Sequence, residues 1–275
     1  MDPTHPKAMF QLLQIHKPKL SIILPTYNRA DYLRQAIESV LVQSHRDFEL
    51  IIINDGSVDT SEEIINSYAD SRIVYVRQCN QGEYPATNTG LRMARGQFVT
   101  WIHSDDIMTP QSLADRVLCL NENQEVDLCH GDIGNIDEAG CVFRLVPAID
   151  MDGLTAFLGY FKPESSRTNP NAVHHTTIMF RREFLGKVGF WDEQLPYAGD
   201  LDWLLRALKH AQIKKVPGTL YLYRHHATSR RQIDACNGVD CRAVVQSILE
   251  RHAPRTNDAQ LNSYNQTTPA QFRAT

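Results

Sequence analysis

Short apolar runs alternate along the first 125 positions with stretches whose apolar residues recur every three or four positions. The runs at 20–25, 49–53, 72–77 and 97–102 predict strands, and the stretches 30–43, 59 onward, 86–94 and 110–123 predict helices. Strands that alternate with helices favour right-handed crossovers and a mostly parallel sheet. The pattern therefore predicts an α/β fold with a Rossmann-like central sheet flanked by helices.

The rhythm changes after residue 123, where the pattern predicts a smaller mixed subdomain. Strands are predicted at 127–136 and 141–145, paired about a turn at 137–140, and further on at 174–180, 213–216 and 219–223. Helices are predicted at 181–187, 199–211 and 239–251. Residues 147–172 contain three prolines and predict an irregular loop or lid. The polar tail 254–275 is expected to be disordered.

Composition narrows the class of protein. The 275 residues are 42% hydrophobic, as in ordinary globular proteins, and the net charge of −4 argues against nucleic acid as a partner. No apolar run approaches the roughly 20 residues that span a bilayer, and residues 1–19 lack a secretory apolar core. We expect a cytoplasmic protein with at most peripheral membrane contact. The six cysteines form no C-x-x-C pair, so neither disulfides nor structural zinc are expected.

Two adjacent carboxylates, Asp105 and Asp106, follow the apolar run 97–102 directly. A buried strand that ends in paired acids places them at the carboxyl edge of the sheet, where open α/β folds bind ligands. Like charges side by side repel unless a cation or strong donors hold them, so the pair predicts a divalent metal site. The alternative is that one Asp caps the next helix and the other is solvated.

The loops after two other strands carry Tyr27 and Asp55. Neither G-x-G-x-x-G nor G-x-x-x-x-G-K-[ST] occurs at these strand ends, which argues against a dinucleotide or P-loop site. An aromatic ring, a lone carboxylate and a metal-binding acid pair together suit a nucleoside diphosphate. The ring can stack, the carboxylate can accept hydrogen bonds, and the cation can neutralise phosphates.

Four motifs occur in order in residues 25–29 (PTYNR), 53–57 (INDGS), 104–106 (SDD) and 198–206 (AGDLDWLLR). In sequence and order they resemble the motifs of family 2 glycosyltransferases, over about residues 19–230. The resemblance implies the GT-A fold, nucleotide-sugar donors and inversion of the anomeric centre. It divides the chain into an N-terminal extension (1–18), a nucleotide-sugar-binding half (19–109), an acceptor-binding and catalytic-base half (110–230), and a C-terminal helix and tail (231–275). Residues 1–18 form either a packing arm or a peripheral helix.

The resemblance also implies roles for individual residues of the donor site. Tyr27 would stack on the nucleobase, Asp55 would hydrogen-bond it, and Thr26 would contact the base or ribose. Asp105 and Asp106 match the acidic metal motif for Mn²⁺ or Mg²⁺, with Asp106 as the direct ligand and Asp105 also expected to bind the nucleotide. His226 resembles a histidine near the metal and diphosphate, although His225 beside it could serve or both could be exposed. For Tyr27, the alternative is an ordinary core position.

On the acceptor side, Asp200 matches the acid that serves as general base, and the alternative is that it only caps its helix. His175 would line the sugar pocket, or else is a buried histidine with satisfied hydrogen bonds. Trp191 is a candidate for stacking an acceptor, and Asp202 is a structural or acceptor-side group. The chain departs from the family at two positions: His103 replaces a common Asp of the metal motif, and Gly199 replaces a common Glu before Asp200.

The expected reaction is transfer of a sugar from a nucleoside-diphosphate sugar, most often a UDP-sugar, to a hydroxyl of a glycan or glycolipid. Its setting would be surface polysaccharide or glycoconjugate biosynthesis. Two alternatives stay open: a non-catalytic nucleotide- or glycan-binding module, and transfer to a polyprenyl phosphate. A glycoside hydrolase is disfavoured, because it needs two carboxylates flanking the bond and no nucleotide site. The sequence leaves the sugar, the acceptor and the oligomeric state undetermined.

Overall fold

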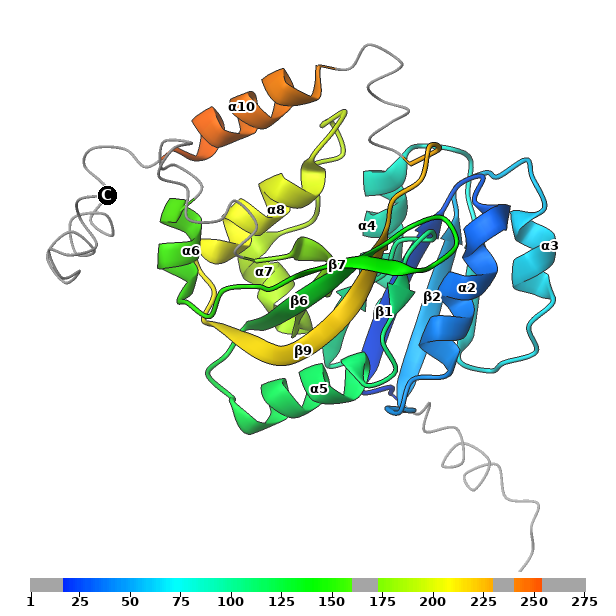
Figure 1. Ribbon diagram of the computed structural model, residues 1–275, viewed down its shortest axis with the longest axis horizontal. Coiled ribbons are helices and arrows are strands. Elements are labelled where there is room, and N and C mark those ends of the chain that lie inside the picture. Colours follow the sequence, from blue (N-terminus) through cyan, green and yellow to red (C-terminus); the bar gives the residue numbers. More distant parts are fainter. Residues whose placement is uncertain (1–16, 160–172, 230–239, 254–275) are drawn as a thin grey trace, which may run out of the picture.

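The structure, a computed structural model, describes residues 17–159, 173–229 and 240–253 (Figure 1). Its strands form one nine-stranded sheet in the order β3-β2-β1-β4-β8-β6-β9-β5, with β7 paired to β6. The strands are β1 (Leu20–Thr26), β2 (Phe48–Asn54), β3 (Ile73–Arg77), β4 (Phe98–Trp101), β5 (Ile107–Met108), β6 (Leu128–Ile136), β7 (Val142–Val146), β8 (Met179–Arg181) and β9 (Ile213–Arg224). The helices are α2 (Ala30–Leu41), α3 (Ser61–Asn66), α4 (Glu83–Met93), α5 (Ser112–Glu122), α6 (Gly153–Gly159), α7 (Leu185–Val188), α8 (Gly199–Leu208) and α10 (Cys241–His252).

The pairing of strands β1 to β4 confirms the predicted parallel core. β1 pairs in parallel with both β2 and β4, and β2 pairs in parallel with β3. Side chains of a strand alternate between the two faces of a sheet. Accordingly, Ile22 and Leu24 pack into one core with residues of α2 and α5, whereas Ile23 packs into a second core with residues of α4 and α8. Both faces of this half are therefore covered, and the carboxyl ends of β1, β2 and β4 meet at one edge.

The second half of the sheet is mixed, as expected for the predicted subdomain. β8 runs antiparallel to β4 and β6, whereas β6 and β9 are parallel. β9 is one strand instead of the two that were predicted, because residues near Gly218 bulge out of the β6–β9 register without ending the pairing. Gly218 adopts φ +87°, a conformation that glycine reaches without strain. The bulge lets one strand run across the sheet and end beside the acid pair.

The predicted strand 174–180 is wrong in its first half. His175–Thr177 form one turn of 3₁₀ helix, here η2, and only Met179–Arg181 pair as β8. The buried Thr177 hydroxyl explains the turn, because it donates to His174 O at 2.7 Å and accepts from Gly131 N at 3.0 Å. The turn moves His175 out of the sheet plane and into the neighbourhood of α8.

Other differences are smaller. Ile107 and Met108, between the predicted strand 97–102 and the predicted helix 110–123, form the short strand β5. Part of the predicted irregular loop 147–172 is helix α6, and residues 160–172 lie outside the described residues. So do residues 1–16 of the N-terminal extension and the tail 254–275. Within the described ranges, five cysteines are free thiols, and the helices are too short or too polar to span a membrane.

Candidate active site

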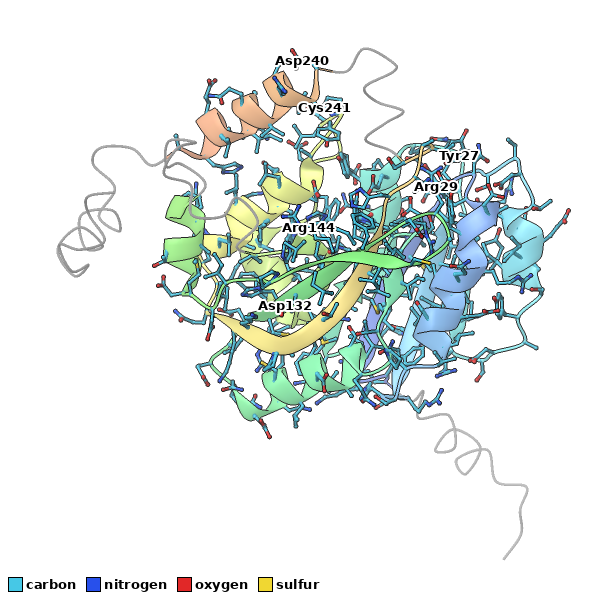
Figure 2. All side chains as sticks on the ribbon, viewed as in Figure 1. Tyr27, Arg29, Asp132, Arg144, Asp240 and Cys241 are labelled. Carbon is cyan, nitrogen blue, oxygen red and sulfur yellow. The ribbon has the colours of Figure 1, made fainter. Side chains whose placement is uncertain are left out.

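The carboxyl ends of β1, β2 and β4 open into a cleft of about 1020 Å³. Its walls include Tyr27 and Arg29 after β1, Asp55 after β2, and Asp105 after β4, together with His175 from η2 and Asp200 from α8. Figure 2 shows Tyr27 and Arg29 together in the loop that follows β1. The fold thus brings residues from four of the recognised sequence motifs to one cavity.

The loop after β1 has a fixed conformation that presents Tyr27. Asn28 adopts the left-handed conformation at φ 50°, which asparagine tolerates better than most residues. Its N–H donates to Ser57 Oγ at 3.0 Å, and its Oδ1 accepts from Val58 N at 2.9 Å, so the loops after β1 and β2 are joined. Tyr27 is 44% exposed and is therefore not a core residue, whereas Thr26 is buried. A ring in this position is available for stacking.

Asp55 is buried and holds the segment 78–82 in place. Its Oδ1 accepts from Gln78 Nε2 at 2.8 Å, and its Oδ2 accepts from Gly82 N at 2.8 Å. The N–H of Gln81 lies 3.0 Å from Oδ1. Asp55 therefore has a structural task that the sequence did not reveal, because it shapes the wall of the cleft that Asn80 and Gly82 line.

Asp106 is 1% exposed, and the end of β9 holds both of its carboxylate oxygens. Tyr221 OH donates to Oδ2 at 2.8 Å, and Arg224 N donates to Oδ1 at 2.8 Å. Burial, together with the charge of Asp105, raises the pKa of Asp106. The side chain of Arg224 adds a further link, because its Nε donates to Asp105 O at 2.8 Å.

Asp105 faces the cleft between two basic side chains. His226 Nε2 lies 3.1 Å from its Oδ2, and Arg29 Nε lies 3.4 Å from the same oxygen. Burial opposes ionisation, but the bond to His226 and the nearby positive charges hold the pKa of Asp105 below its usual value. His226 is buried beside Tyr32, while His225 is exposed, so the structure places His226 and not His225 against the acid pair.

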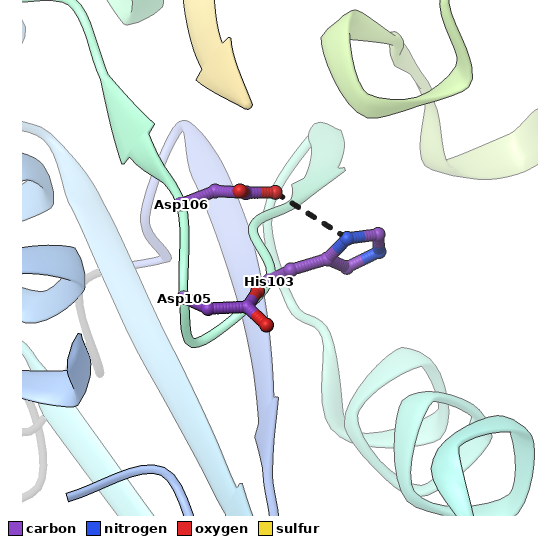
Figure 3. Close-up of side chains that lie close together, drawn as sticks. All are labelled: His103, Asp105 and Asp106. Carbon is purple, nitrogen blue, oxygen red and sulfur yellow. Dashed lines mark ion pairs between the residues drawn. The ribbon is translucent and has the colours of Figure 1, made fainter. Parts of the chain in front are cut away.

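His103 joins the two carboxylates to form one cluster (Figure 3). Its Nδ1 lies 3.5 Å from Asp106 Oδ2, and its Nε2 lies 3.7 Å from Glu83 Oε1. Burial lowers the pKa of His103, but Asp106, Glu83 and Asp105 outweigh this effect and raise it to about 10. One ligand atom from each of His103, Asp105 and Asp106 can lie within 4.8 Å of the others. Two carboxylates and an imidazole grouped in this way fit a divalent cation.

Asp200 lies in the first turn of α8 and lines the cleft. Its Oδ2 lies 2.8 Å from His175 Nε2, and its Oδ1 accepts from Leu201 N at 2.9 Å. Burial opposes ionisation, but the charge and hydrogen bond of His175 hold the pKa of Asp200 far below its usual value. The ring centroid of His175 lies 6.0 Å from that of His103, so the imidazole of His175 stands between this carboxylate and the cluster.

Tyr84 explains why glycine precedes Asp200. Gly199 N donates to Tyr84 OH at 3.0 Å, and a Cβ on Gly199 would lie 2.9 Å from two carbons of the Tyr84 ring. No larger residue fits there without displacing the ring or the helix. Ala198, the preceding residue, adopts a left-handed conformation at φ 57°, which turns the chain into α8. The ring of Tyr84 thereby fixes the position of Asp200.

Two weaker sequence predictions fall outside the cleft. Trp191 is 3% exposed and packs edge-on against Trp101 at 5.3 Å, so in this structure it presents no face for stacking an acceptor. Asp202 is 2% exposed; its Oδ2 accepts from Arg206 Nε at 2.9 Å, and its Oδ1 lies 2.8 Å from His252 Nε2. Asp202 therefore ties α10 to α8, which lie next to each other in Figure 1.

The sequence reasoning missed several residues that complete the site: Arg29, Glu83, Tyr84, Tyr221 and Arg224. Arg29 and Arg224 are close in sequence to recognised motif residues, so the sequence could have identified them as site residues. Tyr84 and Tyr221 carry no such signal, because each lies more than 110 positions from its partner in the site.

Comparisons with known proteins agree with this geometry. The profile of Glycosyl transferase family 2 matches residues 21–189 of the chain. An uncharacterised glycosyltransferase of Haemophilus influenzae is 33% identical over 220 residues, covering 78% of this chain and 79% of that protein. One of Rickettsia felis is 28% identical over 251 residues, covering 86% of this chain. The chain spans 39% of that Rickettsia protein, so such relatives are considerably longer.

Solved structures share the fold. S. aureus TarS (residues 1–349), solved in complex with UDP-GlcNAc, superposes with a TM-score of 0.63 at 18% identity, over 93% of this chain and 77% of that one. The mannosyltransferase PcManGT of Pyrobaculum calidifontis, solved with GDP-Man and Mn²⁺, gives a TM-score of 0.57 at 20% identity, over 86% and 64%. These neighbours confirm the predicted GT-A fold. With the family match over residues 21–189, the chain belongs to glycosyl transferase family 2.

Proposed function

We propose that this chain is a glycosyltransferase that inverts the anomeric centre, with Asp200 as general base and a UDP-sugar as donor. The observation that carries the proposal is the placement of Asp200 in the same cleft as Asp105, with His175 paired to Asp200 and its ring 6.0 Å from that of His103. An inverting displacement needs a base near the attacking hydroxyl and a positive charge near the departing diphosphate. The cleft supplies residues suited to both tasks.

In the proposed reaction, an acceptor hydroxyl attacks the sugar C1 while the C1–O bond to the nucleoside diphosphate breaks. The hydroxyl proton passes to Asp200, whose carboxylate is ionised at neutral pH because His175 stabilises its charge. The bond from His175 also fixes the orientation of the carboxylate. Attack from the face opposite the leaving group inverts the configuration at C1.

Tyr27 would stack on the nucleobase, with Asp55 and Thr26 beside it. The cleft volume of about 1020 Å³ is at the upper end for small-molecule sites, which leaves room for a donor and part of an acceptor. Asp105, Asp106 and His226 would hold a divalent cation, which when bound would offset the charge of the diphosphate. The UDP-GlcNAc complex of TarS and the Mn²⁺ complex of PcManGT support the choice of UDP-sugars and Mn²⁺ as the first ligands to test.

The acceptor is proposed to be a hydroxyl of a glycan or glycolipid in surface polysaccharide or glycoconjugate synthesis. This part of the proposal rests on the sequence resemblance. The expected cytoplasmic location and the division into donor-binding and acceptor-binding halves likewise remain predictions. The alternative is transfer to a polyprenyl phosphate, and a screen of acceptors would distinguish it from transfer to a glycan hydroxyl.

A screen of sugar nucleotides for nucleoside diphosphate release, with Mn²⁺ or Mg²⁺, tests the proposal. We expect metal-dependent release from one donor, and a product whose anomeric proton coupling in NMR shows inversion. Binding of a donor without release, in the presence of acceptor fractions, would instead indicate a non-catalytic module. Retention of configuration would overturn the role assigned to Asp200.

A further inference from the structure

His103 stands where the family commonly has an acid, and its surroundings suggest a task for the imidazole. Nδ1 faces the carboxylate cluster, at 3.5 Å from Asp106 Oδ2. Nε2 is shielded from solvent and has no hydrogen bond among the described residues, and its acidic neighbour is Glu83 Oε1 at 3.7 Å. The two ring nitrogens therefore point toward different carboxylates.

This arrangement matches how proteins prepare a histidine to bind a metal. A metal-bound imidazole almost always donates its other N–H to a carboxylate, a carbonyl or water, which fixes the tautomer and the orientation of the ring. Glu83, in the first turn of α4, is placed to be that acceptor for Nε2, which leaves Nδ1 directed at the cluster of Asp105 and Asp106.

A nitrogen donor changes which cation the site prefers. Mg²⁺ favours a shell of oxygen atoms, whereas imidazole nitrogen suits divalent transition metals, for which the affinity of a given site rises from Mn²⁺ to Cu²⁺. An aspartate at position 103 would supply oxygen and one more negative charge. His103 belongs to the cluster with Asp105 and Asp106, and His226 Nε2, 3.1 Å from Asp105 Oδ2, is a second nitrogen beside it.

We propose that His103 is a ligand of the divalent cation through Nδ1, with Glu83 as its outer partner, and that it shifts the site from Mg²⁺ toward Mn²⁺ and similar ions. The replacement of the family's acid is then a change of metal preference and not a loss of the metal site. The inference rests on the proposed function only in assuming that a cation binds at the acid pair.

Pulsed electron paramagnetic resonance of Mn²⁺ bound to the full chain with UDP tests the inference without turnover. We expect coupling of Mn²⁺ to two ¹⁴N nuclei in the wild type. His103→Asp, which restores the family's residue, should leave one, and His226→Asn should also leave one. His225→Asn, which changes an exposed histidine of the same cleft, should leave both.

Competition binding adds a second readout. His103→Asp should narrow the preference for Mn²⁺ over Mg²⁺ by about ten-fold, and Glu83→Gln should weaken Mn²⁺ binding by about ten-fold while keeping both couplings. An unchanged nitrogen count and ion preference in His103→Asp would overturn the inference. That result would leave the proposed function untouched, because the function is tested by donor turnover and the inference by the spectrum. Absence of Mn²⁺ binding in wild type would also overturn it.

Discussion

Two buried histidines should make the stability of the protein strongly dependent on pH. His130, on β6, is fully buried, and neither ring nitrogen has a hydrogen-bond partner in the described part of the chain. His174, just before η2, is 6% exposed, with Nε2 unpartnered. Burial, with a neighbouring imidazole in each case, lowers the pKa of both to about 4. The substitution His130→Leu removes one of these two imidazoles.

The magnitude follows from proton linkage. Because the pKa is lower in the folded chain than in the unfolded chain, the unfolded state binds more protons at acid pH. The loss of stability therefore begins near the unfolded value of 6.5 and continues until the pH reaches about 4. At about pH 5, each histidine costs about 2 kcal/mol relative to neutral pH. Both together cost at most about 4 kcal/mol, and His130→Leu removes about half.

Urea unfolding of wild type and His130→Leu at about pH 7.5 and pH 5 measures this term. The wild type should lose about 2 kcal/mol more than the variant between the two pH values, and carboxylate contributions cancel in the comparison. His225→Leu, at an exposed histidine, is the control and should follow the wild type. Equal pH dependence in wild type and His130→Leu would refute the reasoning that His130 is buried without partners.

Three further substitutions each test one contact in the site. Gly199→Ala places a Cβ against the Tyr84 ring, so it should lower the free energy of unfolding in urea by about 1–3 kcal/mol. Adding Tyr84→Ala should recover part of that loss. A Gly199→Ala variant as stable as the wild type would contradict the close contact. Asp55→Ala leaves the donors of the 78–82 segment unpaired, so it should lower the free energy of unfolding by about 2–3 kcal/mol and weaken UDP binding in calorimetry. Unchanged stability would show that Asp55 does not hold the segment. Tyr221→Phe removes a hydrogen-bond donor to Asp106 and should weaken Mn²⁺ binding by about ten-fold. An unchanged Mn²⁺ affinity would contradict this role of Tyr221.

The parallel half of the fold could be predicted because its signals are local. The strands 20–26 and 48–54 contain the unbroken apolar runs 22–25 and 50–53, and each loop after them carries its functional residue within a few positions. Apolar runs of this kind are typical of strands covered on both faces. Tyr27, Asp105 and Asp200 therefore reach the cleft that their positions at strand and helix ends implied.

The rest depends on contacts between distant positions. The sequence pattern predicted a strand over 174–180, but the buried hydroxyl of Thr177 closes a turn there and brings His175 to Asp200. Trp191 was predicted to stack on an acceptor, yet its ring packs against Trp101 and Tyr84. Tertiary packing decided both cases, and no pattern within a few residues carries that information.

The central claim is that Asp200 takes the proton of the acceptor, and the most direct measurement is donor turnover and donor binding of Asp200→Asn beside Asp31→Asn. Both residues are acids in the first turn of a helix, and Asp31 is exposed on α2. The account predicts that Asp200→Asn loses at least about 100-fold in kcat with donor affinity unchanged, while Asp31→Asn keeps full activity. Full turnover by Asp200→Asn would contradict it.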